Sequence, residues 1–196
     1  MRFVLINISK CIPSNVIDRW NEAALKIPGE ESQTRGYKQD QIDNHHIHSG
    51  YTQASEHRRS EVRWLRQDTN SELTNEITSR LLEVVNREAE VLACDYYQHL
   101  APIQHTTYYT GCYYKTHIDS FEDPNRLYNR KISISVSLSD ESEYTGGKLI
   151  VKGKEANMSS KGDISIFLSY MPHEVTPVLS GTRKSLVAWI RGPQWR

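Results

Sequence analysis

Apolar residues recur with a helical period in two stretches of the first half of the chain. The first stretch covers residues 13–27, where Ser14 or Asn15 can cap a helix. Its apolar stripe consists of Val16, Ile17, Trp20, Ala24 and Ile27. A second helix is expected from about Ser71 to Cys94. Its stripe consists of Leu73, Ile77, Leu81, Val84, Val85 and Leu92.

Beyond residue 130 the pattern changes to a period of two, and a short apolar run at Phe3–Ile8 also predicts a strand. In KISISVSL, residues 131–138, apolar side chains alternate with serines, so the two kinds lie on opposite faces. Further short strands are expected at KLIVK, DISIFL, HEVTPV and SLVAWI. Helices followed by about seven strands predict an α+β chain, mostly β: a double-stranded β-helix, or jelly roll, braced by N-terminal helices.

The chain has 196 residues, which predicts a single domain. Within it, residues 1–100 are expected to form helical support and a loop region, and residues 101–196 the jelly-roll core. Residues 29–60 contain few large apolar groups and are expected to be a long loop.

The charge balance narrows the choice of partners. Lys and Arg together number 24, as do Asp and Glu, so the net charge is zero and disfavours nucleic acid and anionic membranes as partners. The apolar run near the N-terminus is too short for a signal peptide, and no later run approaches a membrane span. Cys11, Cys94 and Cys112 include no CxxC pair and are expected to be reduced thiols, which predicts a cytoplasmic protein.

The stretch YYTGCYYKTHID, residues 108–119, carries the first candidate chemistry. On a strand, His117 and Asp119 point to the same face, so their side chains can hold one divalent metal. Two histidines and one carboxylate form the facial triad of non-heme Fe(II) oxygenases, which leaves three positions on the iron open. His173 is the best candidate for the second histidine because it too lies in the β-rich region.

Arg183 follows His173 by ten residues. If residues 180–182 form a three-residue hairpin loop, Leu179 faces Arg183 and His173 faces Trp189. One face of this hairpin then carries His173, Arg183, Ser185 and Trp189. A guanidinium suits bidentate capture of a carboxylate, so a metal with open positions and a nearby arginine predicts a dicarboxylic cosubstrate such as 2-oxoglutarate.

From about residue 104 onward the chain resembles the prolyl 4-hydroxylase class of Fe(II)/2-oxoglutarate dioxygenases, and especially the PKHD-type hydroxylases. YYTGCYYKTHID matches the pattern Y-x-x-G-x-x-Y-x-x-H-x-D of that family. RKISISVSLSDESEYTGGKLIV resembles its strand, acidic loop and Gly-Gly turn. GDISIFLSYMPHEVTPVLSGTRKSLVAWI resembles its G-D, H-x-V-x-P-V, S-G-x-R and W elements. RRSEVRWL, residues 58–65, is similar to a segment of phage and bacterial members.

The resemblance implies a role for each candidate residue. It makes His117, Asp119 and His173 the iron ligands and Arg183 the partner of the distal carboxylate of 2-oxoglutarate. Beside the cosubstrate it places Tyr108, Ser185 and Trp189. The implied cofactors are Fe(II), 2-oxoglutarate and O2, with ascorbate as a candidate reductant. The implied substrate is a peptide, protein or small molecule with a prolyl-like target.

Two other functions stay open at this point: an AlkB-like nucleic-acid demethylase, which the zero net charge disfavours, and a non-catalytic metal-binding jelly-roll module. Lys184 is the alternative cation, but strand alternation turns it away from the face of Arg183. The polar segment with His45, His46 and His48 is expected to be solvated. The basic run EHRRSEVRWLR, residues 56–66, is also expected to be a solvated face, with a rim for acidic substrates as the alternative.

Overall fold

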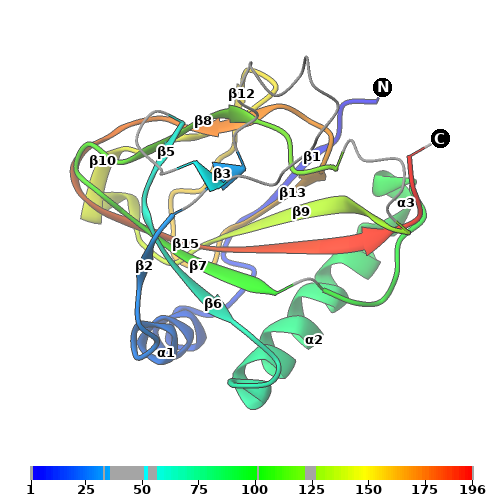
Figure 1. Ribbon diagram of the computed structural model, residues 1–196, viewed down its shortest axis with the longest axis horizontal. Coiled ribbons are helices and arrows are strands. Elements are labelled where there is room, and N and C mark those ends of the chain that lie inside the picture. The colour runs from blue at the N-terminus through cyan, green and yellow to red at the C-terminus, as the bar shows by residue number, and fades with distance from the viewer. Residues whose placement is uncertain are drawn as a thin grey trace.

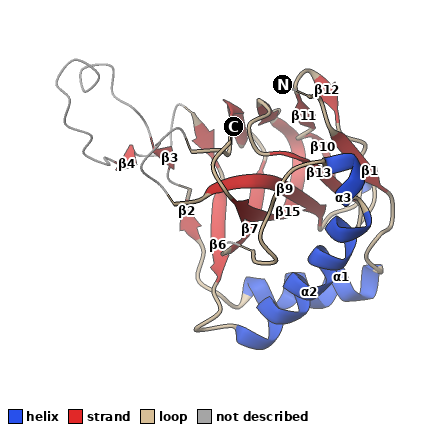
Figure 2. Cartoon of the chain, turned by 90° about the vertical axis from the view of Figure 1, so that its right-hand side faces the viewer, coloured by secondary structure: helices blue, strands red, loops and turns tan. Residues whose placement is uncertain are grey.

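The computed structural model describes residues 2–32, 34–35, 51–52, 57–100, 102–121 and 127–195. Two antiparallel sheets form a layered sandwich, and helices cover the outer face of the larger sheet (Figure 1 and Figure 2). The expected architecture, mostly β with helical support, is confirmed.

The strands of both sheets come from both halves of the chain. The larger sheet has the spatial order β1 (Leu5–Ile8), β13 (Ile164–Leu168), β9 (Asn129–Ser137), β15 (Val178–Gly192), β7 (Ile103–Tyr109), β6 (Glu61–Leu65) and β2 (Glu30–Glu31). The smaller sheet has the order β12 (Lys154–Glu155), β11 (Leu149–Val151), β14 (His173–Val175), β8 (Tyr113–His117) and β5 (Arg58–Arg59). The 3-10 turn η2 (Glu141–Glu143) leads into β10 (Tyr144–Gly146), which pairs with β15. A separate pair joins β3 (Thr34–Arg35) to β4 (Tyr51–Thr52).

The helices bury the apolar stripes that their sequences predict. Helix α1 (Ser14–Leu25) buries Val16, Ile17, Trp20 and Ala24. Helix α2 (Ser71–Arg87) buries Thr74, Ile77, Leu81, Val84 and Val85. The expected single second helix is wrong in one respect, because Glu88 separates α2 from a short helix α3 (Ala89–Leu92). Ala93, in the left-handed region at φ 46°, ends α3.

The alternating strand β9 separates the core from the interior of the sandwich. Ser133 on β9 contacts Asp119 beyond the end of β8, so its serine face points toward the smaller sheet. The apolar residues between the serines therefore point toward the helices, and Ile132, Ile134 and Val136 are fully buried there. On β9, this arrangement turns hydroxyl groups toward the space between the sheets.

The hairpin that we expected at residues 180–182 is wrong, because β15 runs through this stretch without a turn. Ser180 and Gly181 pair with β10, and Gly181 lies directly opposite Tyr144. Gly181 has φ 75°, and a Cβ atom there would lie 2.1 Å from the carbonyl oxygen of Glu143. The glycine thus permits a close approach of two backbones, not a chain reversal. His173 consequently lies in the smaller sheet and does not face Trp189 along one hairpin.

The long loop expected over residues 29–60 is wrong for the parts that the structure describes. Glu30–Glu31 pairs with β6, and Arg58–Arg59 pairs with β8. Ser32, Arg58 and Ser60 are buried. Residues 33, 36–50 and 53–56, with the three histidines at 45, 46 and 48, lie outside the described residues.

All three cysteines are free thiols, as expected. In the part of the chain that the structure describes, no helix is long and apolar enough to cross a membrane.

His105 on β7 is fully buried between the larger sheet and α1, where its Nε2 lies 2.9 Å from Asn21 Oδ1. Burial, assisted by Arg63 and Lys184, lowers the pKa of His105 to about 4. As the pH falls below about 6.5, the unfolded chain binds a proton that the folded chain does not take up until about pH 4. The free energy of unfolding should therefore fall across this window, by roughly 3 kcal/mol when the transition is complete.

Urea unfolding at pH 7 and pH 4.5 tests this prediction. His105→Gln should remove about 2 kcal/mol of the pH-dependent loss, whereas His99→Gln, at an exposed histidine, should remove none. An identical pH dependence in wild type and His105→Gln would contradict it.

Candidate active site

Three sequence-predicted residues converge between the two sheets. His117 ends β8 and His173 begins β14, and the two are direct partners across this strand pair. Asp119 follows β8 by two residues. One ligand atom from each of the three residues lies within 4.8 Å of the others. Asp119 Oδ1 lies 3.7 Å from His117 Nε2, and Asp119 Oδ2 lies 3.4 Å from His173 Nε2.

Backbone carbonyls orient both imidazoles toward the centre of this cluster. His117 Nδ1 lies 2.9 Å from the carbonyl oxygen of Lys115, and His173 Nδ1 lies 2.9 Å from that of Met171. Because a carbonyl oxygen can only accept, each Nδ1 carries the hydrogen and donates it. The lone pair of each neutral ring is then on Nε2, the atom that faces Asp119, as in metal-binding histidines.

The electrostatics of the cluster favour a bound cation. Burial, reinforced by His173, lowers the pKa of His117 to about 3, so this imidazole is neutral at neutral pH. Burial opposes the charged forms of Asp119 and His173, but their mutual contact outweighs it. The imidazole lowers the pKa of Asp119, and the carboxylate raises the pKa of His173. A buried carboxylate between two imidazoles is a donor set that fits a divalent metal.

Two side chains from the larger sheet hold one oxygen of Asp119. Ser133 Oγ on β9 donates to Asp119 Oδ2 at 2.7 Å, and Trp189 Nε1 on β15 donates to the same oxygen at 2.8 Å. Ser133 Oγ also lies 2.9 Å from Ser169 Oγ. Sequence reasoning missed both contacts to Asp119, although the serine face of β9 and the tryptophan were visible in the pattern.

Removing the N–H donor of Trp189 while keeping an aromatic ring in its place should weaken metal binding. Trp189→Phe keeps a ring beside Asp119 but leaves Oδ2 with one donor fewer, so metal affinity should fall by roughly 10- to 100-fold. Ser133→Ala should act in the same direction. Trp64→Phe is the matched control, since that ring lies 6.3 Å from the Trp189 ring. A metal titration monitored by calorimetry measures the effect, and unchanged affinity in Trp189→Phe would contradict it.

Arg183 lies on the same face of β15 as Trp189, six residues before it. Its Nη1 donates to Ser185 Oγ at 3.2 Å, and its guanidinium carbon lies 5.3 Å from the centre of the Tyr108 ring. Tyr108 is its direct partner on β7, and all three side chains are buried. Lys184 points to the opposite face, where it influences His105. The structure therefore brings Arg183, Ser185 and Tyr108 together and separates Lys184 from them.

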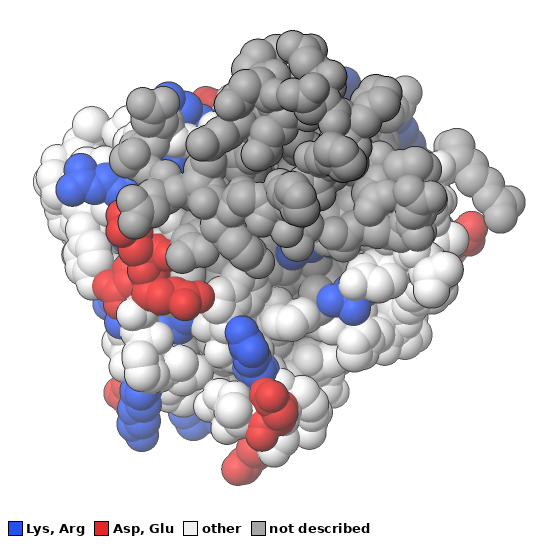
Figure 3. Space-filling model, viewed as in Figure 1, with Lys and Arg blue, Asp and Glu red and all other residues white. Residues whose placement is uncertain are grey.

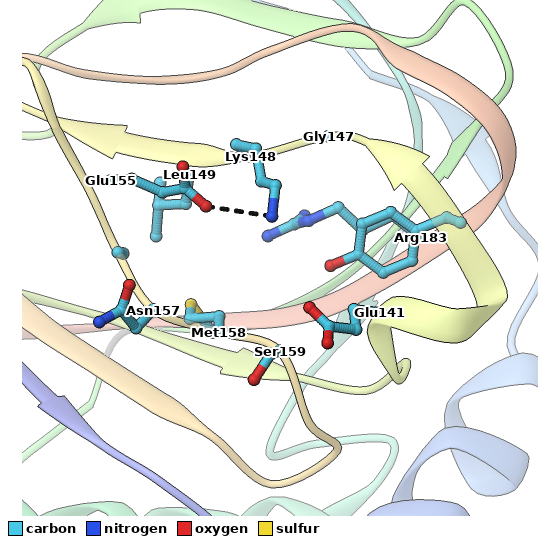
Figure 4. A pocket seen from close by; sticks show the side chains of 11 residues that line it. Glu141, Gly147, Lys148, Leu149, Glu155, Asn157, Met158, Ser159 and Arg183 are labelled. Carbon is cyan, nitrogen blue, oxygen red and sulfur yellow. Dashed lines mark ion pairs between the residues drawn. The ribbon is translucent and has the colours of Figure 1, made fainter.

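A cavity of about 320 Å³ opens beside Arg183 (Figure 4). Its wall includes Tyr144 from β10, Leu149 from β11, and Met158 from the loop before β13. Lys148 and Glu155 form an ion pair of 3.1 Å across one side. The volume is that of a small-molecule pocket, and Arg183 gives it a buried positive group.

Glycine at position 147 leaves room for the arginine at the edge of this cavity. Gly147 has φ 58°, and a Cβ atom there would lie 3.0 Å from Arg183 Cδ. The positive φ and the nearby Arg183 side chain thus explain why glycine occupies the second position of the Gly-Gly turn.

Arg58 is a residue of this site that sequence reasoning assigned to a solvated face. That expectation is wrong for Arg58, which is 7% exposed and lies opposite Tyr114 in the pairing of β5 with β8. The Tyr114 ring stacks on the His117 imidazole, with ring centres 3.5 Å apart and planes at 14°. Burial raises the pKa of Tyr114 to about 12, so its phenol is neutral. Its neighbour Arg59 is exposed, as expected for a charged run.

Comparison with known proteins agrees with this geometry. Residues 103–191 match the family model of the 2OG-Fe(II) oxygenase superfamily. The expected resemblance to PKHD-type hydroxylases is also confirmed. A PKHD-type hydroxylase of Idiomarina loihiensis is 29% identical over 120 residues, which cover 58% of this chain and 53% of that protein.

A PKHD-type hydroxylase of Teredinibacter turnerae is 30% identical over 127 residues, which cover 62% of this chain and 56% of that protein. The chain thus spans about half the length of the curated relatives that it matches.

Solved structures show the same fold over nearly the whole chain. The viral collagen prolyl hydroxylase of Paramecium bursaria Chlorella virus-1, in its 2OG complex, has a TM-score of 0.68 at 20% identity and covers 96% of each chain. A prolyl-4-hydroxylase of Pseudomonas putida has a TM-score of 0.68 at 19% identity, covering 97% of this chain and 93% of that one. The expected jelly roll is confirmed.

Proposed function

We propose that this protein is an Fe(II)- and 2-oxoglutarate-dependent dioxygenase of the prolyl 4-hydroxylase type. The observation that carries the proposal is the convergence of two imidazole Nε2 atoms and one carboxylate on a single point between the sheets. Both imidazoles have their hydrogens on the far side, so the donor atoms fit a metal as they stand. Two histidines and one carboxylate are the donor set of non-heme iron oxygenases.

The residues of the site take distinct roles in this proposal. His117, Asp119 and His173 would hold Fe(II), and Trp189 and Ser133 fix the carboxylate of Asp119 by donating hydrogen bonds to its Oδ2. Fe(II), 2-oxoglutarate and O2 together supply the oxidising chemistry that hydroxylates a C–H bond and turns 2-oxoglutarate into succinate and carbon dioxide.

The row from Arg183 to Trp189 along β15 provides the binding surface for the cosubstrate. The guanidinium of Arg183 pairs with its distal carboxylate, with Ser185 and Tyr108 beside it. Arg183 is itself buried, so an ion pair with it is shielded from water and thereby strengthened.

A prolyl-like target in a peptide, a protein or a small molecule is the proposed substrate. The names of the relatives and the solved prolyl hydroxylases support this choice. Ascorbate is proposed as an accessory reductant that keeps the iron ferrous.

Other functions are less well supported. The zero net charge argues against an AlkB-like nucleic-acid demethylase. On the face drawn in Figure 3, acidic and basic side chains occur side by side, without a continuous basic surface among the residues that it colours. A buried arginine beside a small-molecule cavity argues against a metal-binding module without catalysis, because such a module does not need a second binding site next to its metal.

Succinate formation tests the proposal. Purified protein with Fe(II), ascorbate and 2-oxoglutarate should form succinate in air, slowly alone and faster when a proline-containing peptide or metabolite is accepted. Removal of the iron by a chelator should stop the reaction, and Fe(II) should restore it. If protein with bound iron and 2-oxoglutarate formed no succinate, either alone or with any proline-containing compound, the proposal would be wrong.

A further inference from the structure

Arg58 is a buried cation with neutral partners. Its Nε donates to Ser60 Oγ at 2.9 Å and its Nη2 lies 3.5 Å from Thr106 Oγ1. Its guanidinium carbon lies 4.6 Å from the centre of the Tyr114 ring. Among the described residues, no carboxylate forms an ion pair with it. Burying a charge without a counter-charge is unfavourable, so the counter-charge of Arg58 has to lie beyond the described residues.

The position of Arg58 connects it to the reaction centre. Tyr114 contacts the guanidinium of Arg58 and the imidazole of His117, so one aromatic ring separates the cation from a metal-binding side chain. On its other side Arg58 reaches Thr106, which lies directly opposite Ser185 in the pairing of β7 with β15. Arg58 and Arg183 thus lie at two ends of one short polar row inside the sandwich.

The charges of Fe(II), 2-oxoglutarate and the two charged residues that would bind them balance one another, which leaves Arg58 without a counter-charge among them. Ferrous iron and Arg183 together carry as much positive charge as Asp119 and the two carboxylates of 2-oxoglutarate carry negative charge. Arg58 adds one further buried positive charge beside His117, with the Tyr114 ring between them. The proposed metal, cosubstrate and their ligands therefore leave the charge of Arg58 without a partner, and a negatively charged substrate would supply one.

We propose that the substrate carries a carboxylate that pairs with Arg58, so that the hydroxylated group belongs to an acid. This inference rests on the proposed function for its location, since it places the substrate beside the iron. Two sources can supply the carboxylate: the α-carboxylate of a prolyl-like amino acid or chain end, or an acidic side chain next to the target residue in a peptide.

Binding to the protein loaded with Fe(II) and 2-oxoglutarate without oxygen tests the proposal, and it needs no turnover. One matched pair of probes is acetyl-proline and acetyl-prolinamide. The other is acetyl-Pro-Glu-amide and acetyl-Pro-Gln-amide. We expect the acid of at least one pair to bind roughly tenfold or more tightly than its neutral partner, and the pair that discriminates identifies the source. The preference should weaken as salt is raised from about 50 to 500 mM.

Variants of Arg58 and its neighbour test whether Arg58 causes the preference for the acid probe over the amide probe. Arg58→Gln keeps a donor near Ser60 and Thr106 without the charge, so acid and amide should then bind within about threefold of each other. Arg58→Lys should retain part of the preference, and Arg59→Gln, at the exposed neighbour, should retain all of it. In Arg58→Gln the affinity for 2-oxoglutarate should stay within about threefold of wild type.

The outcomes separate this inference from the proposed function. Equal binding of acid and amide by wild type overturns the inference, as does failure of all four probes to bind, whether or not Arg58→Gln folds. A preference that survives in Arg58→Gln also overturns it. A loss of 2-oxoglutarate affinity in Arg58→Gln would instead make Arg58 a cosubstrate ligand. Succinate formation, measured separately, reports on the dioxygenase assignment alone.

Discussion

Replacing His117, Asp119 or His173 with alanine is expected to abolish 2-oxoglutarate turnover while the protein stays folded. In the proposed site the three side chains hold one metal, so the loss of any one opens the coordination sphere. Turnover should fall by on the order of a thousandfold or more, because the iron carries the chemistry. Iron affinity, measured by titration under anaerobic conditions, should fall in parallel.

Stability should change much less than activity in these variants. The three polar side chains do not belong to the hydrophobic core, so unfolding free energies should stay within about 2 kcal/mol of wild type. His57→Ala is the matched control. The ring of His57 lies 6.5 Å from that of His117 and makes edge contacts to His117 and Tyr114 without belonging to the cluster. Full activity in any of the three ligand variants would exclude the triad.

Replacing Arg183 with alanine is expected to raise the KM for 2-oxoglutarate by roughly three orders of magnitude while iron still binds. The guanidinium is buried beside Ser185 and Tyr108. If it pairs with the distal carboxylate of the cosubstrate as proposed, its removal leaves that carboxylate desolvated and unpaired. Breaking a buried ion pair in this way costs about 3–5 kcal/mol, which corresponds to roughly a thousandfold in affinity. Arg183→Lys should fall between the two, because an ammonium provides one point charge in place of a fork.

Lys184→Ala is the control for this prediction. Lys184 is adjacent in sequence but lies on the opposite face of β15, toward His105 and α1. Its removal should leave the 2-oxoglutarate affinity within about threefold of wild type. Side-by-side titration of 2-oxoglutarate into both alanine variants decides the matter. Loss of the cosubstrate in Lys184→Ala with retention in Arg183→Ala would contradict the arrangement described here.

The parts of this site that depend on local backbone geometry could be predicted from the sequence. His117 and Asp119 share one side because residues two apart along an extended chain point the same way. The same period separated the serines of β9 from its apolar residues and Arg183 from Lys184. The stripes of α1 and α2 followed equally from the helical period. In each case the decisive spacing is a few residues, and the backbone conformation alone sets the side-chain directions.

The contacts between distant segments were decided only by the tertiary structure. His173 meets His117 through the pairing of β14 with β8, and Asp119 is held by Trp189 across the sandwich. Pairing partners of this kind are chosen by the packing of whole sheets, which no local spacing encodes. Gly181 shows the ambiguity in one residue, because a positive φ serves a turn and a close backbone approach equally well. Arg58 shows the same ambiguity for a charged residue. It lies in a basic segment of the kind that is usually exposed to solvent, but the pairing of β5 with β8 turns its guanidinium inward beside Tyr114.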